Sequence, residues 1–289
     1  MTTRYRLLLY ILTPPAVGTY VVHHELRALE EKYPALPADD TTCSLALRTP
    51  TSPSTQHSPH IDIYSARIPL SSLPSATAPI TPEGLQSPQA HQTLSTRWAQ
   101  ALVGSRILRW EGSVFGLFSS RGFQPGDIGL SEEEFGPLPV NVNANVKEDR
   151  NQKRQLLNGG FIVERPPSQD GNPYGLLVSW DFPDDLRVLF EKIARWGYPW
   201  RFMSGGRHEM SVSKPYFVSG REGEEEEGWV VDVRFSSAHD YEIVPAEGGL
   251  EGQKTIPEWT VRLHRGFARL VLDRAVGEWV GGGGIDVYR

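Results

Sequence analysis

The chain has 289 residues, of which 39% are hydrophobic, with a net charge of −6 and a mean hydropathy of −0.37. This length allows one large domain or two small ones, with a soluble core and a substantial share of loop. Lysines and arginines are scattered among acidic residues, which argues against nucleic acid as the main partner. The single cysteine, Cys43, excludes an intrachain disulfide framework and a cysteine-rich metal site, and we expect a buried or incidental thiol there rather than a nucleophile.

The N-terminal stretch from Leu7 to Val22 is apolar over 16 residues and carries Pro14 and Pro15 in its middle. A spanning helix needs about 20 apolar residues, so the stretch is short for a membrane crossing. Three interpretations stay open, in this order of preference: a buried core element broken at the prolines, a membrane-associated anchor, and a targeting segment. Glu25 to Tyr33 is expected to be helical.

Residues 48–94 are dominated by Ser, Thr and Pro. Such a composition cannot bury enough apolar surface to fold alone, so we expect a flexible insert with one short strand in the stretch HIDIYSARIPL. The apolar spacing from Ser95 to Phe118 predicts one or two short helices, with Gly104 and Gly112 as weak points. Phe123 to Asn158 is rich in loop residues.

From Gly160 onwards the pattern becomes strand-like. Phe161 to Arg165 and Tyr174 to Trp180 flank a turn rich in Pro, Gly, Asp and Asn, which predicts a hairpin. A helix follows, opened by Pro183 and ended by Gly197. The remaining strands are expected over Arg207–Ser213 and Gly228–Ser237, with His239–Val244 as an extension or a separate strand.

The longest predicted element is a helix from Thr255 to Val280. Thr255 and Glu258 have the spacing of a capping box, and Pro257 suits the first turn. The helical spacing predicts a buried stripe of Trp259, Leu263, Phe267, Leu270 and Val271, and a charged face of Glu258, Arg262, Arg265, Arg269 and Asp273. Glycines Gly281 to Gly284 end the helix.

Familiar catalytic and phosphate-binding motifs do not occur in the sequence. No G-x-G-x-x-G follows a strand, and there is no Walker A loop, no G-x-S-x-G elbow and no H-E-x-x-H. His23 and His24 are adjacent, and neighbours on a helix diverge instead of converging on one metal. The adjacent glutamates Glu224 to Glu227 predict a solvated loop.

His208 is the candidate base of the predicted strand RHEMSVS, because imidazole transfers protons near neutral pH. Alternation places His208, Met210 and Val212 on one face, which could line a cavity. The alternative is a histidine satisfied in the core or at its rim, since nothing else in the stretch marks a base.

Asp232 and Arg234 share one face of the next strand, opposite an apolar face made of Trp229, Val231, Val233 and Phe235. They could orient a ligand as polar groups in an apolar lining, or form a cross-strand ion pair that contributes little if exposed. His239 and Asp240 could form an acid–base dyad, but adjacent residues point apart in an extended chain. Which face meets the long helix stays open.

An aromatic cluster in RWGYPWRF is expected to be core or to close one end of a cavity. His264 is expected at the edge of the buried stripe of the long helix. The residues assigned to catalysis are His208, Asp232 and Arg234. Those assigned to substrate binding are Met210, Val212, Trp200, Phe202, Leu263 and Phe267, and no metal ligand is assigned.

The order of elements resembles the helix-grip architecture of the START/SRPBCC superfamily, and in particular its DUF2867-like branch. HIDIYSARIPL followed by WAQALVGSRILRWEGSVFGL is similar to that branch's strand and helical insert, and GGRHEMSVS is similar to its central strand. VVDVRFSSAHDYEIV leading into RLHRGFARLVLDRAV resembles its final strand and helix. The N-terminal apolar segment, the Ser/Pro-rich insert and the loop from Phe123 to Asn158 depart from a minimal helix-grip domain.

The resemblance implies a curved sheet wrapped on the long helix, with an apolar cavity between them. Members of the superfamily bind lipids, sterols, polyketides or hormones, and some catalyse cyclisation or isomerisation. The branch offers no catalytic motif, so the resemblance transfers no catalytic residue, and a fold this versatile does not fix a function.

We therefore expect an α+β fold in which a curved antiparallel sheet grips a long C-terminal helix, with long loop insertions. The expected organisation is an N-terminal apolar segment and helix (1–47), a flexible insert (48–94) and a helix-grip-like domain (95–289), the last forming one domain with 1–47.

The expected function is the binding of a hydrophobic small molecule between sheet and helix. The leading hypothesis is a natural-product enzyme without a cofactor that cyclises, isomerises or dehydrates a polyketide- or terpenoid-like intermediate. The alternatives are a non-catalytic lipid or sterol carrier, associated with membranes through Leu7 to Val22, and a structural role with a collapsed cavity. We expect a cytoplasmic location, with membrane association as the alternative, and the oligomeric state stays open.

Overall fold

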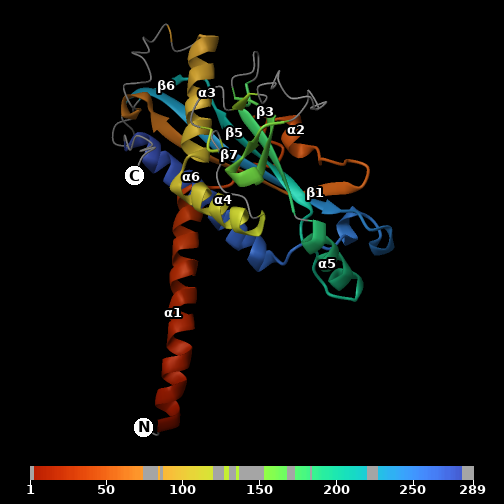
Figure 1. Ribbon diagram of the computed structural model, residues 1–289. Coiled ribbons are helices and arrows are strands. Elements are labelled where there is room, and N and C mark those ends of the chain that lie inside the picture. Colours follow the sequence, from red (N-terminus) through yellow and green to blue (C-terminus); the bar gives the residue numbers. More distant parts are fainter. Residues whose placement is uncertain are drawn as a thin grey trace.

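The computed structural model describes residues 3–73, 84, 87–119, 127–129, 135–136, 153–167, 173–182, 184–219 and 227–281. In this part of the chain one curved antiparallel sheet has the strand order β1-β7-β5-β4-β3-β2, and β6 pairs with β7 beyond the end of β5 (Figure 1). The strands are β1 (Gln56–Pro69), β2 (Gln155–Leu156), β3 (Phe161–Arg165), β4 (Leu176–Asp181), β5 (Gly205–Val212), β6 (Tyr216–Val218) and β7 (Gly228–Glu242).

The long C-terminal helix packs against this sheet, which confirms the expected α+β, helix-grip-like fold. The helices are α1 (Thr3–Lys32), α2 (Leu45–Arg48), α3 (Pro88–Val103), α4 (Arg106–Ser119), α5 (Asp184–Arg195) and α6 (Glu258–Val280). Helices α3, α4 and α6 bury side chains in the main core, on one side of the sheet. Helix α2 lies on the opposite side, where Leu47 packs on Ile63 and Leu177.

Alternation along β7 decides which side of the sheet meets α6. Val231, Val233 and Phe235 are buried in the main core together with Val271 and Leu272 of α6. The apolar face predicted for this strand is therefore the one that faces the helix. The strand also continues through Glu242, so the stretch from His239 onwards extends the sheet.

Two expectations for the middle of the chain need correction. The strand expected as a short one in the insert is β1, which runs over 14 residues and pairs with β7 along most of that length. Helix α3 begins at Pro88, inside the stretch expected to be flexible, because Ser87 caps it by accepting a hydrogen bond from the Ala90 N–H. The predicted hairpin is confirmed as β3 and β4, and most of the loop expected from Phe123 to Asn158 lies outside the described residues.

Helix α6 is covered on more than one side, so a single buried stripe does not describe it. The side chains that it buries in contact with the rest of the fold are Val261, Ala268, Arg269, Val271, Leu272, Ala275 and Trp279. Trp259 and Leu263 are 61% and 41% exposed, so the predicted stripe is wrong at its N-terminal end. The reason is α1, which covers part of the charged face: Arg262 pairs with both carboxylate oxygens of Glu30, at 2.8 and 3.0 Å.

The predicted capping box of α6 is also wrong. The helix begins at Glu258, and Pro257 occupies the cap position without a side-chain hydrogen bond. The Thr255 hydroxyl donates to the Ile256 carbonyl, at 3.3 Å, instead of to the first turn. The extended backbone before Pro257 carries Thr255 away from the helix end, as the residues preceding a proline favour.

Helix α1 leaves the body of the protein as a single long helix (Figure 1). It runs through Pro14 and Pro15, so the break expected at the prolines is wrong, and every residue from Gly18 to Glu25 is exposed. Its C-terminal end is anchored: the Arg269 guanidinium donates to the Tyr33 carbonyl, at 2.8 Å. Among the described residues, no helix combines the length and the apolar character that a membrane crossing demands.

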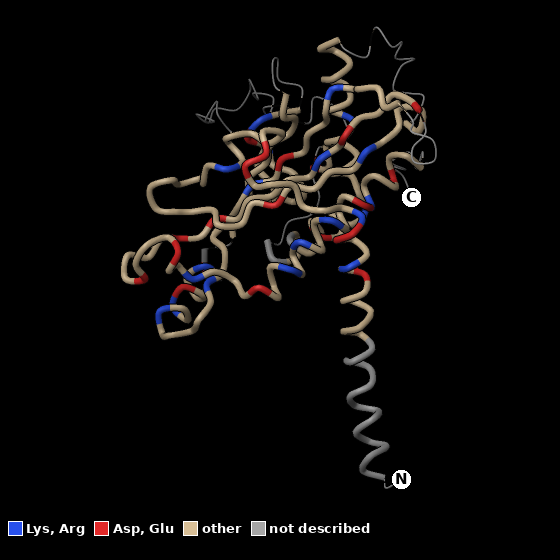
Figure 2. Tube along the Cα trace, turned by 180° about the vertical axis from the view of Figure 1, so that it is seen from behind, with Lys and Arg blue, Asp and Glu red and all other residues tan. Residues whose placement is uncertain are grey.

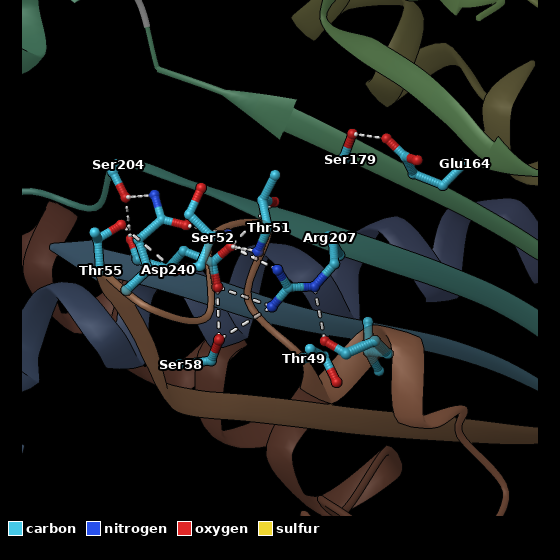
Figure 3. A network of polar contacts seen from close by, with 12 residues as sticks. Thr49, Thr51, Ser52, Thr55, Ser58, Glu164, Ser179, Ser204, Arg207 and Asp240 are labelled. Carbon is cyan, nitrogen blue, oxygen red and sulfur yellow. Dashed lines mark hydrogen bonds and ion pairs between the residues drawn. The ribbon is translucent and has the colours of Figure 1, made fainter.

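A buried polar network holds the segment around α2 on the back of the sheet, away from α6 (Figure 3). Arg207 of β5 and Asp240 of β7 form a two-pronged ion pair at 2.6 and 2.8 Å. The same guanidinium donates to the Leu47 carbonyl at 2.8 Å and to Ser58 Oγ at 3.0 Å. Both charged side chains are almost fully buried, so these hydrogen bonds replace the water that would otherwise stabilise the two charges.

Candidate active site

Two rows of residues cross the sheet on the side that faces α6. The registers of β4, β5, β7 and β1 place one row in the order Trp180, Gly206, His239 and His60. The next row is Val178, His208, Ser237 and Asp62. Residues directly opposite one another in an antiparallel sheet share a face, so the two rows bring three histidines together.

Helix α6 adds a fourth histidine over these rows. The ring of His264 lies 4.4 Å from that of His239, nearly perpendicular to it. The neighbouring Arg265 donates to the Asp62 carboxylate at 2.8 Å, which fixes this turn of α6 over β1. We call the group the histidine cluster; it consists of His60, Trp180, His208, Ser237, His239 and His264.

Aromatic rings enclose His208. Trp180 stacks on its imidazole with the ring centres 6.2 Å apart, and Phe161 and Phe235 flank it at 5.4 and 5.2 Å. Gly206 permits this packing, because a Cβ atom there would lie 2.9 Å from the Trp180 ring. The indole therefore fills the position in the first row where a side chain is missing.

The histidine cluster contains buried polar atoms without a hydrogen-bond partner among the described residues. Such atoms occur elsewhere too, but five lie in these rows: Trp180 Nε1, His208 Nδ1, Ser237 Oγ, His239 Nε2 and His60 Nε2. Leaving one such group unsatisfied costs about 1–3 kcal/mol, and native interiors contain few of them. Trp180, His208, His60 and His264 each keep some side-chain surface accessible to solvent, whereas the unpartnered atoms themselves are buried.

Burial keeps the histidines of the cluster neutral. It lowers the pKa of His208 to about 3, and the nearby His264 and Arg207 act in the same direction. Burial also lowers the pKa of His239 far below its ordinary value, and the pKa of His60 falls for the same reason. A neutral imidazole offers one N–H donor and one acceptor nitrogen, so the cluster suits uncharged polar groups.

This burial changes the role expected of His208. A base with a pKa near 3 accepts protons poorly at neutral pH, because an efficient base has a pKa near the working pH. Burial lowers the pKa of His264 as well, but the Asp62 carboxylate nearby opposes that shift. Asp62 opposes the lowering of the His60 pKa in the same way, so His264 and His60 are both better proton acceptors than His208.

The depressed pKa of His208 predicts a pH dependence of folding stability. In the unfolded chain His208 takes up a proton below pH 6.5, whereas in the folded chain it does so only near pH 3. The contribution of neutral His208 to folding stability is therefore complete above pH 6.5 and is lost as the pH falls towards 3. We expect His208→Phe to reduce the slope of unfolding free energy against pH by about 1.4 kcal/mol per pH unit between pH 6 and 4.5. Urea denaturation of both proteins at several pH values measures this, and equal slopes would contradict it.

The structure does not bring Asp232 and Arg234 together with His208. Both lie on the back face of β7, where the Asp232 carboxylate accepts a hydrogen bond from the Tyr216 hydroxyl at 2.9 Å. Asp232 also forms ion pairs with Arg67, at 3.6 Å, and with Arg234, at 3.8 Å. This arrangement corresponds to cross-strand pairing, which was the plainer interpretation of these residues.

The other residues assigned to the site divide between core and surface. Met210 and Val212 share the face of His208 but are buried in the main core, and Phe267 packs against that core. Phe202 lies against the small cluster that includes Tyr241 and Trp180, at the edge of the histidine cluster. Trp200 and Leu263 are exposed.

Sequence reasoning missed most of the histidine cluster. His239 was considered only as a dyad with Asp240, and the two do point to opposite sides of β7, towards His264 and Arg207. Only the strand register places His239 beside His60, a residue 179 positions earlier in the chain. One signal could have found these residues. On β1 and β7 the alternation with period two does not end with the apolar positions of the strand but continues into polar residues on the same face.

The structure therefore combines an open antiparallel sheet and a C-terminal helix with a group of neutral histidines and a partly buried tryptophan on the side of the sheet that faces the helix. Within the described residues, no three His, Cys, Asp or Glu side chains are arranged to hold a metal ion. Comparisons of the chain with family models, with curated proteins and with solved structures gave no match.

Proposed function

We propose that the chain binds a small uncharged molecule in the histidine cluster and catalyses a proton transfer on it, in an isomerisation, a dehydration or a cyclisation. The observation that supports this most is the set of five unpartnered polar atoms in two adjacent rows. Indole, imidazole and hydroxyl groups together bind a carbonyl or hydroxyl oxygen, and the rings of Phe161 and Phe235 suit a flat cyclic skeleton.

The cluster divides the chemical roles between helix and sheet. His264 of α6 accepts the proton, while His208 and His239 stay neutral and hydrogen-bond to the oxygen on which negative charge develops. Groups whose surroundings push their pKa values apart can take different roles at one pH. Packing of α6 on the sheet would thus assemble the site, since it brings the ring centre of His264 to 4.4 Å from that of His239.

The substrate class that we propose is a polyketide- or terpenoid-like compound with an enolisable carbonyl group. Such chemistry needs orientation, exclusion of water and one or two polar groups, and it requires no cofactor. We propose a cytoplasmic location for the domain, where the single, buried thiol of Cys43 stays reduced.

Mass spectrometry of small molecules extracted from the purified protein tests the proposed ligand. We expect a discrete cyclic compound with a carbonyl or hydroxyl group from the wild-type chain. His239→Phe removes a buried nitrogen but keeps a ring, so it is expected to lose the compound, whereas His24→Phe, on the exposed part of α1, is expected to retain it. Absence of any cyclic compound from the wild type, or full retention of it by His239→Phe, would contradict the proposal.

A further inference from the structure

The junction of α1 and α6 carries exposed apolar and basic side chains on one side of the protein. Tyr20, Val21 and Val22 of α1 are 69%, 49% and 48% exposed, and Trp259 of α6 is 61% exposed. An open groove of about 430 Å³ lies at the junction, lined by Glu30 of α1 and by Glu258, Trp259, Arg262, Arg265 and Arg269 of α6. Figure 2 shows basic positions along α6 next to the point where α1 leaves the body.

The two helices are joined rigidly at this junction. Arg262 of α6 pairs with Glu30 and also contacts His23 Nδ1 at 3.1 Å. Lys32 pairs with Asp273 at 2.6 Å. The direction in which α1 projects is therefore set by these contacts with α6.

The composition of α1 indicates what covers it. Its outer half contains six consecutive apolar residues, Leu7 to Leu12, and an α-helix completes a turn in 3.6 residues, so these positions go fully round the helix. A groove on a protein partner covers one side of a helix, whereas lipid covers every side. Tyr20 and Trp259 near the body are the residue types that concentrate at the boundary between lipid and water.

We propose that α1 and the adjoining outer face of α6 form a docking surface for a lipid bilayer with anionic headgroups. The stretch from Leu7 to Val22 inserts into one leaflet, with Tyr20 and Trp259 at the boundary of headgroups and acyl chains. Arg262 and Arg265 line the groove, and although they pair with Glu30 and Asp62, their side chains stay 40% and 38% exposed, which leaves guanidinium surface for the phosphate of a headgroup.

The helix enters one leaflet without crossing the bilayer. Sixteen residues extend about 24 Å, less than the roughly 30 Å of a hydrocarbon core. This inference is independent of the function proposed for the histidine cluster.

Co-sedimentation of the full chain with phosphatidylcholine vesicles, with and without phosphatidylserine, tests the proposal. We expect binding that is stronger with phosphatidylserine and weakens with salt. The double variant Val21→Asp, Val22→Asp is expected to bind at least about tenfold more weakly, because it places charge in the lipid boundary. Trp259→Ala is expected to bind about threefold more weakly.

Trp110→Ala is the matched control, since Trp110 is 67% exposed on α4 and is no part of the docking surface. It is expected to bind as the wild type does. All the substituted residues are exposed, so circular dichroism and melting curves should show the same fold in every variant. Failure of the wild type to bind either vesicle, equal binding by the double variant, or a dimer in solution that leaves no monomer to bind vesicles overturns the proposal.

Discussion

Replacing Asp240 by alanine is expected to lower the free energy of unfolding by about 3–5 kcal/mol, because removing one partner of a buried ion pair leaves the other charge without compensation. In the folded chain Asp240 accepts both terminal nitrogens of Arg207, and the two side chains are 1% and 5% exposed. The Ser58 hydroxyl and the backbone N–H of Thr51 also donate to the Asp240 carboxylate, at 2.5 and 3.3 Å. Urea denaturation at neutral pH measures the loss.

Asp232→Ala provides a matched control on the same face of the same strand. Its carboxylate is 23% exposed, and its pairs with Arg67 and Arg234 are long, at 3.6 and 3.8 Å. Loose, partly exposed pairs of this kind contribute about 0–1 kcal/mol and the Tyr216 hydrogen bond about 1 kcal/mol, so the control is expected to lose less stability. Similar losses of unfolding free energy for Asp232→Ala and Asp240→Ala would contradict the expectation that the buried ion pair of Arg207 and Asp240 stabilises the fold strongly.

The back-face network also positions the histidine cluster. Arg207 and His208 are neighbours on β5, and His239 and Asp240 are neighbours on β7, so each strand presents a charged residue to the back and a histidine to α6. The ion pair ties the two strands at the height of the cluster. Locking the back of the sheet in this way fixes the spacing of the histidines on the front.

Much of the fold could be predicted because strand alternation is a local property. The apolar face of β7, the hairpin of β3 and β4 and the long helix α6 follow from spacing within short stretches. The buried face of α6 was harder to predict, because the apolar spacing along the helix indicates only one covered side. Arg269 is buried against Tyr33 and Tyr64, which no pattern within α6 could indicate.

The candidate site could be predicted only in part. His208 was found from its own strand, but its role changed once the surrounding Trp180, Phe161 and Phe235 showed how deeply it is enclosed. Asp232 and Arg234 were chosen for chemistry without knowledge of the register, and the sheet places them on the other face. A site assembled from four strands and a helix depends on pairings between residues far apart in sequence, which spacing along one strand cannot supply.

Catalysis of proton exchange is the central claim for the histidine cluster, and His264 is its critical residue. Its ring faces His239 from α6, and the Asp62 carboxylate opposes the lowering of its pKa. Glutamine keeps hydrogen-bonding capacity at this position but cannot accept a proton at neutral pH. His264→Gln therefore separates loss of proton transfer from loss of binding.

NMR in D₂O of a panel of neutral cyclic ketones, followed for deuterium uptake beside the carbonyl group, tests this claim most directly. We expect the wild-type chain to accelerate uptake for members of the panel, and His264→Gln to lower kcat by about 10²–10⁴-fold with little change in KM. His208→Phe is predicted to raise KM, and His24→Gln, on the exposed part of α1, to match the wild type. Acceleration that survives His264→Gln, or none by the wild type with any ketone, would contradict the account.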